Sequence, residues 1–328
     1  MEEKELRKMR PLYVAKFIEQ RADERHTVTA NQIMDYLYSK YEISADRKTI
    51  YRDIAMLRDQ FGMDIQTAED TKGYYLMSRQ FELDDLRILA DCVYSARFIS
   101  EERTEDLIDL LCELCSDHQG KLLRRDHRSV VRVKTDNNGT LRTINKIREA
   151  VISLDRKKIS FKYLSHVIEN THVTVEKDGG KAYMVSPIKM IVEGGQCYLM
   201  AWSDENLEVV PYRIDRMTDV QILDEKAENR YFRDREYLEQ SFNMQGGELT
   251  QVELRFENSL LDAVIDKFGT IVVYEKVDDE HFMVKTKVYV SDQFFGWLCG
   301  FGRKAKLMEP EETVERFRVY LNEIKEIY

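Results

Sequence analysis

Proline and glycine are scarce in this sequence, with four prolines and fourteen glycines among 328 residues. This scarcity excludes collagen-like, mucin-like and flexible low-complexity regions. Long hydrophobic runs are missing as well, because no apolar stretch approaches the roughly 18 to 20 residues that span a bilayer. The charged N-terminal stretch lacks the apolar segment of a signal peptide, so we expect a soluble, cytoplasmic protein with no membrane partner.

Cysteine is also rare, and the five residues are Cys92, Cys112, Cys115, Cys197 and Cys299. Cys112 and Cys115 form a CxxC, but they lie in an apolar helical pattern. No second CxxC or histidine pair follows at zinc-finger spacing. We therefore expect Cys112 and Cys115 to be buried thiols on a helix face and the cysteines to be reduced, with no metal site and no cofactor.

Charged residues make up 34% of the chain and hydrophobic residues 43%, which is a globular composition. The length suits two or three domains. The formal net charge is −10, yet the segment from Lys121 to Tyr163 holds 13 Lys and Arg against 4 Asp and Glu. Because phosphate binding needs a local basic face, the acidic total does not exclude a nucleic-acid partner.

The first 78 residues predict short helices followed by a hairpin. Helical spacing between residues 9 and 23 is shown by Leu12, Ala15, Phe17, Ile18 and Ala22. Thr29 is the expected N-cap of a second helix over 30–41, and Ser44 that of a third over 45–61. The third helix has an apolar stripe of Ile50, Ile54, Leu57 and Phe61 and is expected to end at Gly62. Strand-like pieces at 64–67 and 73–77 complete the order of a winged helix-turn-helix.

The third helix carries the most informative side chains. Its apolar stripe leaves a polar and cationic group on the outside, namely Arg47, Lys48, Thr49, Tyr51 and Arg52. Such groups contact phosphates and base edges, and recognition helices use their N-terminal half for base contacts. Lys72, at the hairpin tip, is placed for a phosphate contact. A solvated charged surface is the alternative for all of these residues, and Asp46 and Asp53 are expected to orient the arginines.

The rest of the chain changes character twice. Residues 80–123 predict a helical connector, and a polar stretch near Thr135 marks a boundary. After a helix over 141–154, short strands alternate with turns at 193–195 and 204–206, a pattern typical of a small SH3-like or Sm-like barrel. The last segment, 250–328, predicts the order β-α-β-β-α and a C-terminal helix.

Several motifs resemble one family over nearly the full chain. The stretch SADRKTIYRDIAML, followed by KGYYLM, resembles the helix-turn-helix of DeoR-like, YafY-type regulators that carry a WYL domain. SPIKMIVEGGQCYLMAW and PYRIDRM resemble the WYL domain itself, and FFGWLCGFGRKAKLMEPEETVERF is similar to its C-terminal extension. Cys197 departs from the family, because it stands where the W-Y-L triplet has Trp. This change concerns local packing and pocket shape more than the fold.

The resemblance implies an anionic ligand, such as single-stranded nucleic acid or a nucleotide, bound by the barrel. On the family's motifs, the ligand-binding residues are Tyr163, Tyr212, Arg213 and Arg216, with His166 as a further candidate. Arginines offer bidentate phosphate contacts and tyrosines offer stacking faces for bases. The alternative is a structural ion pair between Asp215 and either arginine.

We therefore expect an α+β multidomain protein. Its parts are a winged helix-turn-helix DNA-binding domain (1–78), a helical connector (79–135), a WYL ligand-sensing β-barrel (136–230) and a C-terminal α+β extension (231–328). The expected function is transcription regulation by a homodimer that binds double-stranded DNA under the control of the ligand. No motif of a catalytic nucleophile, metalloprotease or nucleotide-binding loop occurs, so we expect no enzyme. The alternative is a non-enzymatic adaptor whose barrel binds a protein or RNA, with only non-specific DNA affinity.

Overall fold

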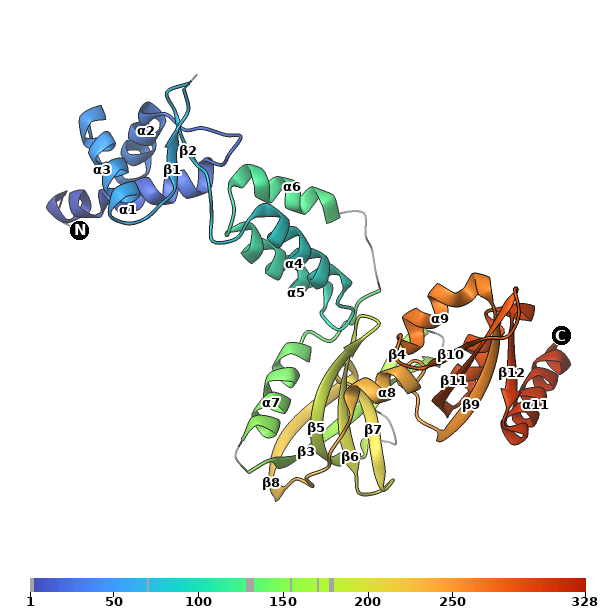
Figure 1. Cartoon of the computed structure of the whole chain (residues 1–328). Coiled ribbons are helices and arrows are strands. Elements are labelled where there is room, and N and C mark those ends of the chain that lie inside the picture. Colours follow the sequence, from blue (N-terminus) through green and yellow to red (C-terminus); the bar gives the residue numbers. More distant parts are fainter. Residues whose placement is uncertain (1–2, 70, 128–132, 154, 170, 177–179) are drawn as a thin grey trace. The chain divides into compact units, whose positions relative to one another are not determined.

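The computed structural model of the chain (Figure 1) describes residues 3–69, 71–127, 133–153, 155–169, 171–176 and 180–328. Side chains are described in the same ranges apart from 3–7, 126–127, 165–169 and 171–176. The chain divides into two compact units, Met1–Asn138 and Gly139–Tyr328, and both contain helices and sheets. The expected α+β multidomain class is confirmed. In the described part of the chain, no helix is both long and apolar enough to cross a membrane.

The first unit begins with helices and a hairpin in the predicted order. These elements are α1 (Glu3–Arg21), α2 (Ala30–Tyr41), α3 (Arg47–Asp59), β1 (Ile65–Thr67) and β2 (Tyr74–Leu76). Thr29 caps α2 as expected, through a capping box in which Gln32 and Thr29 each accept the other's backbone N–H. The N-cap of α3 is Asp46 and not Ser44, because the Asp46 carboxylate accepts the N–H of Thr49 at 2.7 Å.

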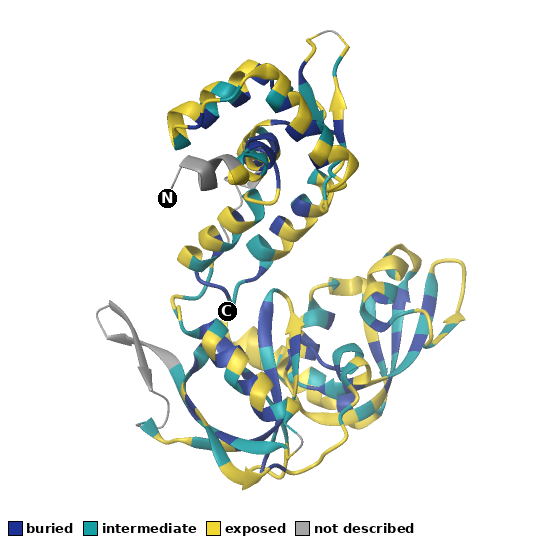
Figure 2. Ribbon diagram, turned by 90° about the vertical axis from the view of Figure 1, so that its left-hand side faces the viewer, coloured by how far each residue is buried: buried dark blue, intermediate teal, exposed yellow. Residues whose placement is uncertain are grey.

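The core of these elements lies between the inner faces of the helices and the hairpin, where buried residues gather (Figure 2). It includes Val14, Ile18, Ile33, Leu37, Ile50, Ile54, Leu57, Ile65 and Leu76. The sequence-based placement of two residues in this core is wrong, since Leu12 is 50% and Phe61 68% exposed. Because α3 ends at Asp59, Phe61 lies beyond the helix and off its apolar stripe. Leu12 lies on the side of α1 that faces away from the core.

The first unit continues with a helical bundle that consists of α4 (Leu83–Ser95), α5 (Glu101–Cys112) and α6 (Asp117–His127). A buried polar contact fastens this bundle to the end of α1. The Ser116 hydroxyl donates to the Asp23 carboxylate at 2.5 Å, and both residues are almost completely buried. Arg79 donates from one nitrogen to the carbonyls of Glu19 and Ala22 at the same end of α1. The bundle therefore shares a buried junction with the helix-and-hairpin module, by which we mean α1, α2, α3, β1 and β2.

The second unit begins with one helix and an antiparallel sheet. The elements are α7 (Thr140–Ile152), β3 (Lys157–Glu169), β4 (Thr171–Glu176), β5 (Tyr183–Glu193), β6 (Gln196–Ser203), β7 (Glu208–Arg213), the 3-10 helix η2 (Ile214–Arg216) and β8 (Met217–Lys226). The strand order is β4-β3-β5-β6-β7, and β8 pairs with β3. Gly194 and Gly195 have φ of +57° and +77°, which suits the tight turn between β5 and β6.

This sheet is open, which corrects the closed barrel expected from the sequence. Among the described strands, none of the pairings joins β7 to β8. The reason is η2, which separates the end of β7 from the start of β8. Helix α7 packs against β3, β5, β8 and η2, so it covers one face of the sheet (Figure 1).

The chain then forms a second sheet with its own helices. These elements are α8 (Asp234–Gln240), β9 (Glu248–Glu257), η3 (Asn258–Leu260), α9 (Leu261–Phe268), β10 (Val273–Lys276), β11 (His281–Val290), α10 (Asp292–Cys299), η4 (Gly302–Lys304), β12 (Ala305–Glu309) and α11 (Glu311–Ile327). The strand order β10-β11-β9-β12 and the β-α-β-β-α-β succession are those of a ferredoxin-like module. The sequence pattern predicts β9, α9, β10, β11, α10 and α11. It misses the short helices α8, η3 and η4 and the strand β12, which has five residues and a single buried side chain, Leu307.

Candidate nucleic-acid interface and anion site

Helix α3 presents a cationic face in its N-terminal half. Arg47, Lys48, Tyr51 and Arg52 are exposed and Thr49 is half-buried. The apolar residues Ile50, Ile54 and Leu57 turn the other way and are buried. The structure thus brings all five predicted side chains of α3 onto the outer part of one helix. Arrays of this kind donate hydrogen bonds to phosphates and base edges.

The two acidic residues near this face do not orient its arginines, contrary to the sequence-based expectation. The carboxylate of Asp46 caps α3, and the hydrogen bond from the Thr49 N–H is the main cause that lowers the pKa of Asp46. Asp53 is only 5% exposed and accepts two hydrogen bonds from Arg10, at 2.6 and 3.0 Å. These hydrogen bonds are the main cause that raises the pKa of Arg10. Asp46 therefore stabilises the exposed start of α3, and Asp53 stabilises the packing of α3 on α1 from the buried side.

Asn31 of α2, which sequence reasoning missed, does contact an arginine of this face. Its side-chain oxygen accepts a hydrogen bond from Nε of Arg47 at 3.0 Å. The two residues are 16 positions apart, and no local pattern marks an asparagine on one helix as the partner of an arginine on the next. Through this hydrogen bond, the first residue of α3 donates to the neighbouring helix α2.

The hairpin lies beside α3 in the same module. Lys72 is exposed at its tip, as predicted, and has a φ of +49°. Tyr74 pairs with Val28 through two backbone hydrogen bonds of 2.8 and 2.7 Å, so the hairpin is held to the segment before α2. The rings of Tyr74 and Tyr51 lie 6.4 Å apart. Gly73 has no room for a side chain, since a Cβ there would lie 2.8 Å from the Cβ of Thr27.

Four aromatic rings cluster inside the sheet of the second unit, contributed by Phe161, Tyr163, Tyr183 and Tyr212. Their centroids lie between 5.2 and 6.3 Å apart. Tyr212 is only 6% exposed, so its ring packs within the cluster. Sequence reasoning missed Tyr183, although it pairs directly with Phe161 across β3 and β5. Burial raises the pKa of Tyr163, and its hydroxyl accepts the backbone N–H of Arg213 at 3.1 Å.

The arginines of the predicted ligand site differ in their contacts. Arg213 donates to Asp215 from Nε at 3.1 Å and from Nη2 at 2.6 Å, and its side chain is 27% exposed. Burial disfavours the charge of Arg213, but the hydrogen bonds and charge of Asp215 more than offset this, so the pKa of Arg213 is raised. Arg216 is half-buried and forms no hydrogen bond or ion pair with any described residue. The structural pair that the sequence left as an alternative is thus present for Arg213.

Of the other predicted ligand-binding residues, Tyr163 lies near both arginines and Tyr212 lies in the core. The charges of Arg213 and Arg216 both act on Tyr163 and Tyr198, which places the four residues near one another. The side chain of His166 lies outside the described residues. The predicted constellation therefore comes together around Tyr163, Arg213 and Arg216, while Tyr212 belongs to the core beneath it.

Cys197, at the position of the family's Trp, is buried on β6 with 4% exposure. Burial raises the pKa of its thiol to about 11. A thiol of this kind stays protonated at neutral pH and behaves as a small apolar side chain. Within the described ranges, no group of three or more His, Cys, Asp and Glu residues could hold a metal ion.

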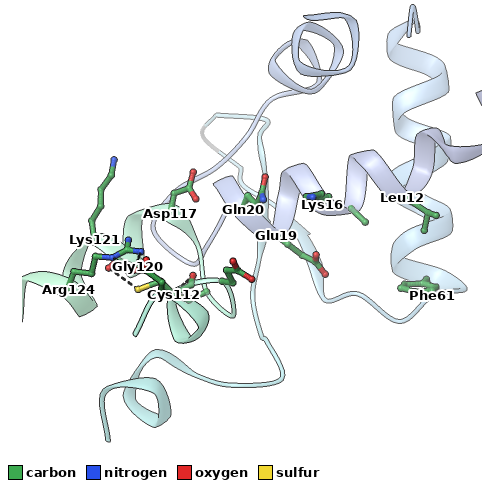
Figure 3. A pocket seen from close by; sticks show the side chains of 14 residues that line it. Leu12, Lys16, Glu19, Gln20, Phe61, Cys112, Asp117, Gly120, Lys121 and Arg124 are labelled. Atoms are coloured by element: carbon green, nitrogen blue, oxygen red, sulfur yellow. Dashed lines mark hydrogen bonds and ion pairs between the residues drawn. The ribbon is translucent and has the colours of Figure 1, made fainter. Parts of the chain in front are cut away.

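A cavity of about 800 Å³ lies in the first unit between α1 and the helices α5 and α6 (Figure 3). Leu12, Lys16, Glu19, Gln20 and Phe61 line one side and Cys112, Asp117, Gly120, Lys121 and Arg124 the other. Arg124 donates to Asp109 at 2.6 Å and Cys112 to the carbonyl of Gly120 at 3.6 Å. The wall is mixed in charge, so its side chains select neither an anion nor a cation.

The folds and sites together describe a multidomain α+β protein with a cationic helix and an arginine-bearing sheet. Residues 142–222 match the WYL domain and residues 248–324 match the WCX domain. The chain therefore carries a WYL domain followed by a WCX domain, which confirms this part of the resemblance. The winged helix-turn-helix of the DeoR-like regulators stays a prediction.

Comparison with whole proteins adds little to this. No curated protein matches the chain. Among solved structures, the chain is similar to proteasome accessory factor B/C (PafBC) of Arthrobacter aurescens, with 14% identity, a TM-score of 0.30, and coverage of 98% of this chain and 48% of that one. The chain thus spans about half the length of PafBC. A CRISPR Cas-related protein shows 11% identity and a TM-score of 0.37, with 92% of each chain covered. TM-scores this low support no functional argument.

Proposed function

We propose that this chain is a DNA-binding transcription regulator that reads duplex DNA with α3 and contacts the backbone with the hairpin. The observation that carries the proposal is the exposed group Arg47, Lys48, Tyr51 and Arg52 at the N-terminal half of α3. A helix fits the major groove, and bidentate arginine contacts to guanine are the commonest specific contact there. Lys72 at the hairpin tip supplies a phosphate contact, as a wing does.

The order of elements supports the proposal. The helix that carries the cations follows two other helices and precedes a hairpin, as in a winged helix-turn-helix. One copy of such a module reads a single half-site, so we propose that a homodimer reads two half-sites about one helical turn apart. The function is binding, and catalysis forms no part of it.

We further propose that the WYL sheet senses an anionic ligand such as single-stranded nucleic acid or a nucleotide. Arg216 supports this, because its guanidinium lies near Tyr163 and Tyr198 and has no partner among the described residues. Arg213 keeps one terminal nitrogen, Nη1, that does not bond to Asp215. The ligand shifts the population of regulator states that bind the operator.

One observation favours the adaptor as a second candidate function. Asp215 neutralises Arg213 inside the sheet, so the arginine needs no ligand to balance its charge. An adaptor would bind a protein or RNA partner through this sheet and would show only non-specific affinity for duplex DNA.

Selection from a pool of random duplexes, followed by binding titrations at several salt concentrations, separates the two functions. A regulator enriches one sequence and binds it at least about 10³-fold more tightly than unrelated duplexes. Arg47→Ala with Arg52→Ala should weaken both this preference and the overall affinity, since the loss of one base contact costs about 1 to 3 kcal/mol and two cations are removed. Arg58→Ala is the matched control, because Arg58 is exposed in the last turn of the same helix and bonds to Asp59. Absence of any preferred duplex supports the adaptor.

A further inference from the structure

We propose that Asn31 is a positioning residue for base recognition, because it orients the guanidinium of Arg47 before DNA arrives. This inference rests on the proposed function of α3. The contact that carries it is the hydrogen bond of 3.0 Å from Nε of Arg47 to Oδ1 of Asn31. It joins the first residue of α3 to the first turn of α2.

Asn31 is itself held in a fixed place. It follows the N-cap Thr29, whose hydroxyl and backbone N–H both contact the side chain of Gln32, at 3.0 and 2.7 Å. This capping box fixes the start of α2 and thus the backbone that carries Asn31. Asp46 fixes the start of α3 in the same way. Both ends of the contact between Asn31 and Arg47 are therefore set by capped helix termini.

The contact determines how Arg47 can read a base. A guanidinium is planar and donates in a rigid fork, so fixing Nε fixes the plane of the whole group. With Nε engaged by Asn31, the fork left for DNA consists of the two terminal nitrogens, Nη1 and Nη2. That pair matches O6 and N7 of guanine, which accept two parallel hydrogen bonds in the major groove. The geometry assigns Arg47 to a guanine contact of this end-on type.

Lys48 and Arg52 provide the contrast on the same face. Both are exposed, and neither forms a hydrogen bond or ion pair with another described residue. Their side chains lose more rotamer freedom when they are ordered by DNA, which suits the less exacting geometry of phosphate contacts. Arg47 is thus the cation of α3 whose orientation is prepared in advance, and it is the one that determines specificity.

The test compares Asn31→Ala with Asn31→Asp in the full-length protein, on the best duplex from selection and on copies that carry one changed base pair. The pair read by Arg47 is the one at which Arg47→Ala loses discrimination. Asn31→Ala should reduce discrimination there about 2- to 10-fold, the scale of one side chain that must be ordered on binding. The salt dependence should not change, because the number of cations is the same. Asn31→Asp keeps the acceptor for Nε and should retain the discrimination, while its charge weakens binding to all duplexes alike.

A double-mutant comparison separates positioning from direct contact. If Asn31 acts through Arg47, then Asn31→Ala causes no further loss when Arg47 is already alanine. An equal loss in both backgrounds would make Asn31 a direct DNA contact and overturn the proposal, as would full discrimination by Asn31→Ala. If the wild type is sequence-specific and Asn31→Ala keeps the same discrimination, only the positioning role of Asn31 is excluded. If the wild type prefers no duplex, both the positioning role and the proposed function are excluded.

Discussion

Arg10 of α1 and Asp53 of α3 are joined by two hydrogen bonds, of 2.6 and 3.0 Å, although 43 residues separate them in the chain. The carboxylate is buried beneath the cationic face of α3, and the arginine comes from the helix on which α3 packs. The pair holds α3 against α1 from its inner side. It explains how an acidic residue can lie within a cationic helix without weakening its outer face.

Arg10→Ala should destabilise the first unit by about 1 to 3 kcal/mol, because it leaves the Asp53 carboxylate buried without its partner. Urea denaturation followed by circular dichroism measures this. Lys16→Ala, at an exposed position of the same helix, is the control and should change the free energy of unfolding by less than about 0.5 kcal/mol. In the double variant Arg10→Ala, Asp53→Ala the loss should be smaller than the sum of the single losses. Additive losses would show that the two residues do not act as a pair.

Much of the structure of the first unit could be predicted from local sequence, and the contacts that the sequence-based predictions missed have a common cause. Thr29 and the stripe of Ile50, Ile54 and Leu57 are properties of a few neighbouring residues, so capping preference and helical period identify them. Asp53 and Asn31 depend on partners 43 and 16 positions away, and no local pattern reveals such partners. The same limit applies to tertiary pairing in general.

In the second unit, too, local sequence predicts the elements but not the contacts between distant residues. Alternation predicted the strands of the WYL region but not whether their edges meet, because closure depends on the chain direction that η2 imposes. The family motif predicted that Tyr163, Arg213 and Arg216 lie in one region, yet it did not reveal that Asp215 accepts two hydrogen bonds from Arg213. Tyr183 joins the aromatic cluster through its register with Phe161, which is a property of the assembled sheet.

The junction between Asp23 and Ser116 predicts a dependence of stability on pH. Burial alone would raise the pKa of Asp23, but hydrogen bonds from Ser116, His26 and the N–H of Arg25 outweigh it, so the pKa is lowered. Since the pKa in the folded state is below that in the unfolded state, the carboxylate stabilises the fold at pH above its ordinary value near 3.8. This stabilisation is lost as the pH falls through the folded-state value. We expect Asp23→Asn to flatten the decline of unfolding free energy below about pH 4.

Ser116→Ala tests the same junction at neutral pH. It removes the hydroxyl that donates to Asp23 and should cost about 1 to 3 kcal/mol, since the buried carboxylate loses a charge-assisted hydrogen bond. Asp266→Asn, a change at an exposed carboxylate of the second unit, is the control for both variants. A pH profile of Asp23→Asn that follows the wild type would rule out this carboxylate as a source of acid sensitivity.

The cysteines should differ sharply in reactivity. Burial raises the pKa of Cys115 and Cys197 to about 11, so almost none of either thiol is ionised at neutral pH. Cys92 is exposed. A short pulse of iodoacetamide at pH 7.5 should therefore modify Cys92 first, and Cys115 and Cys197 only after urea unfolds the chain. Mass spectrometry of the digested protein gives the order, and early modification of Cys197 would contradict its burial on β6.

The two arginines of the WYL sheet make the sharpest test of ligand sensing, because their structural roles differ. Arg216 has no hydrogen-bond partner among the described residues, so Arg216→Ala should leave the thermal midpoint unchanged. If an anion binds there, the same variant should lose about 1.5 to 3 kcal/mol of affinity, the scale of a hydrogen bond to a charged group. Arg213→Ala should lower both affinity and stability, since it leaves Asp215 buried and without the two hydrogen bonds that Arg213 donates.

Titration with short single-stranded oligonucleotides and with mononucleotides, followed by calorimetry, measures these affinities. Arg235→Ala is the matched control, because Arg235 is exposed in the same unit and pairs with Glu239 on α8. Tyr163→Phe keeps the ring but removes the acceptor of the Arg213 N–H, so it should cost stability and leave base stacking intact. Arg216→Ala binding every anion as tightly as the wild type would exclude Arg216 from the ligand site. If no anion binds the wild type either, the Arg213–Asp215 pair is purely structural and the adaptor becomes the better account of this sheet.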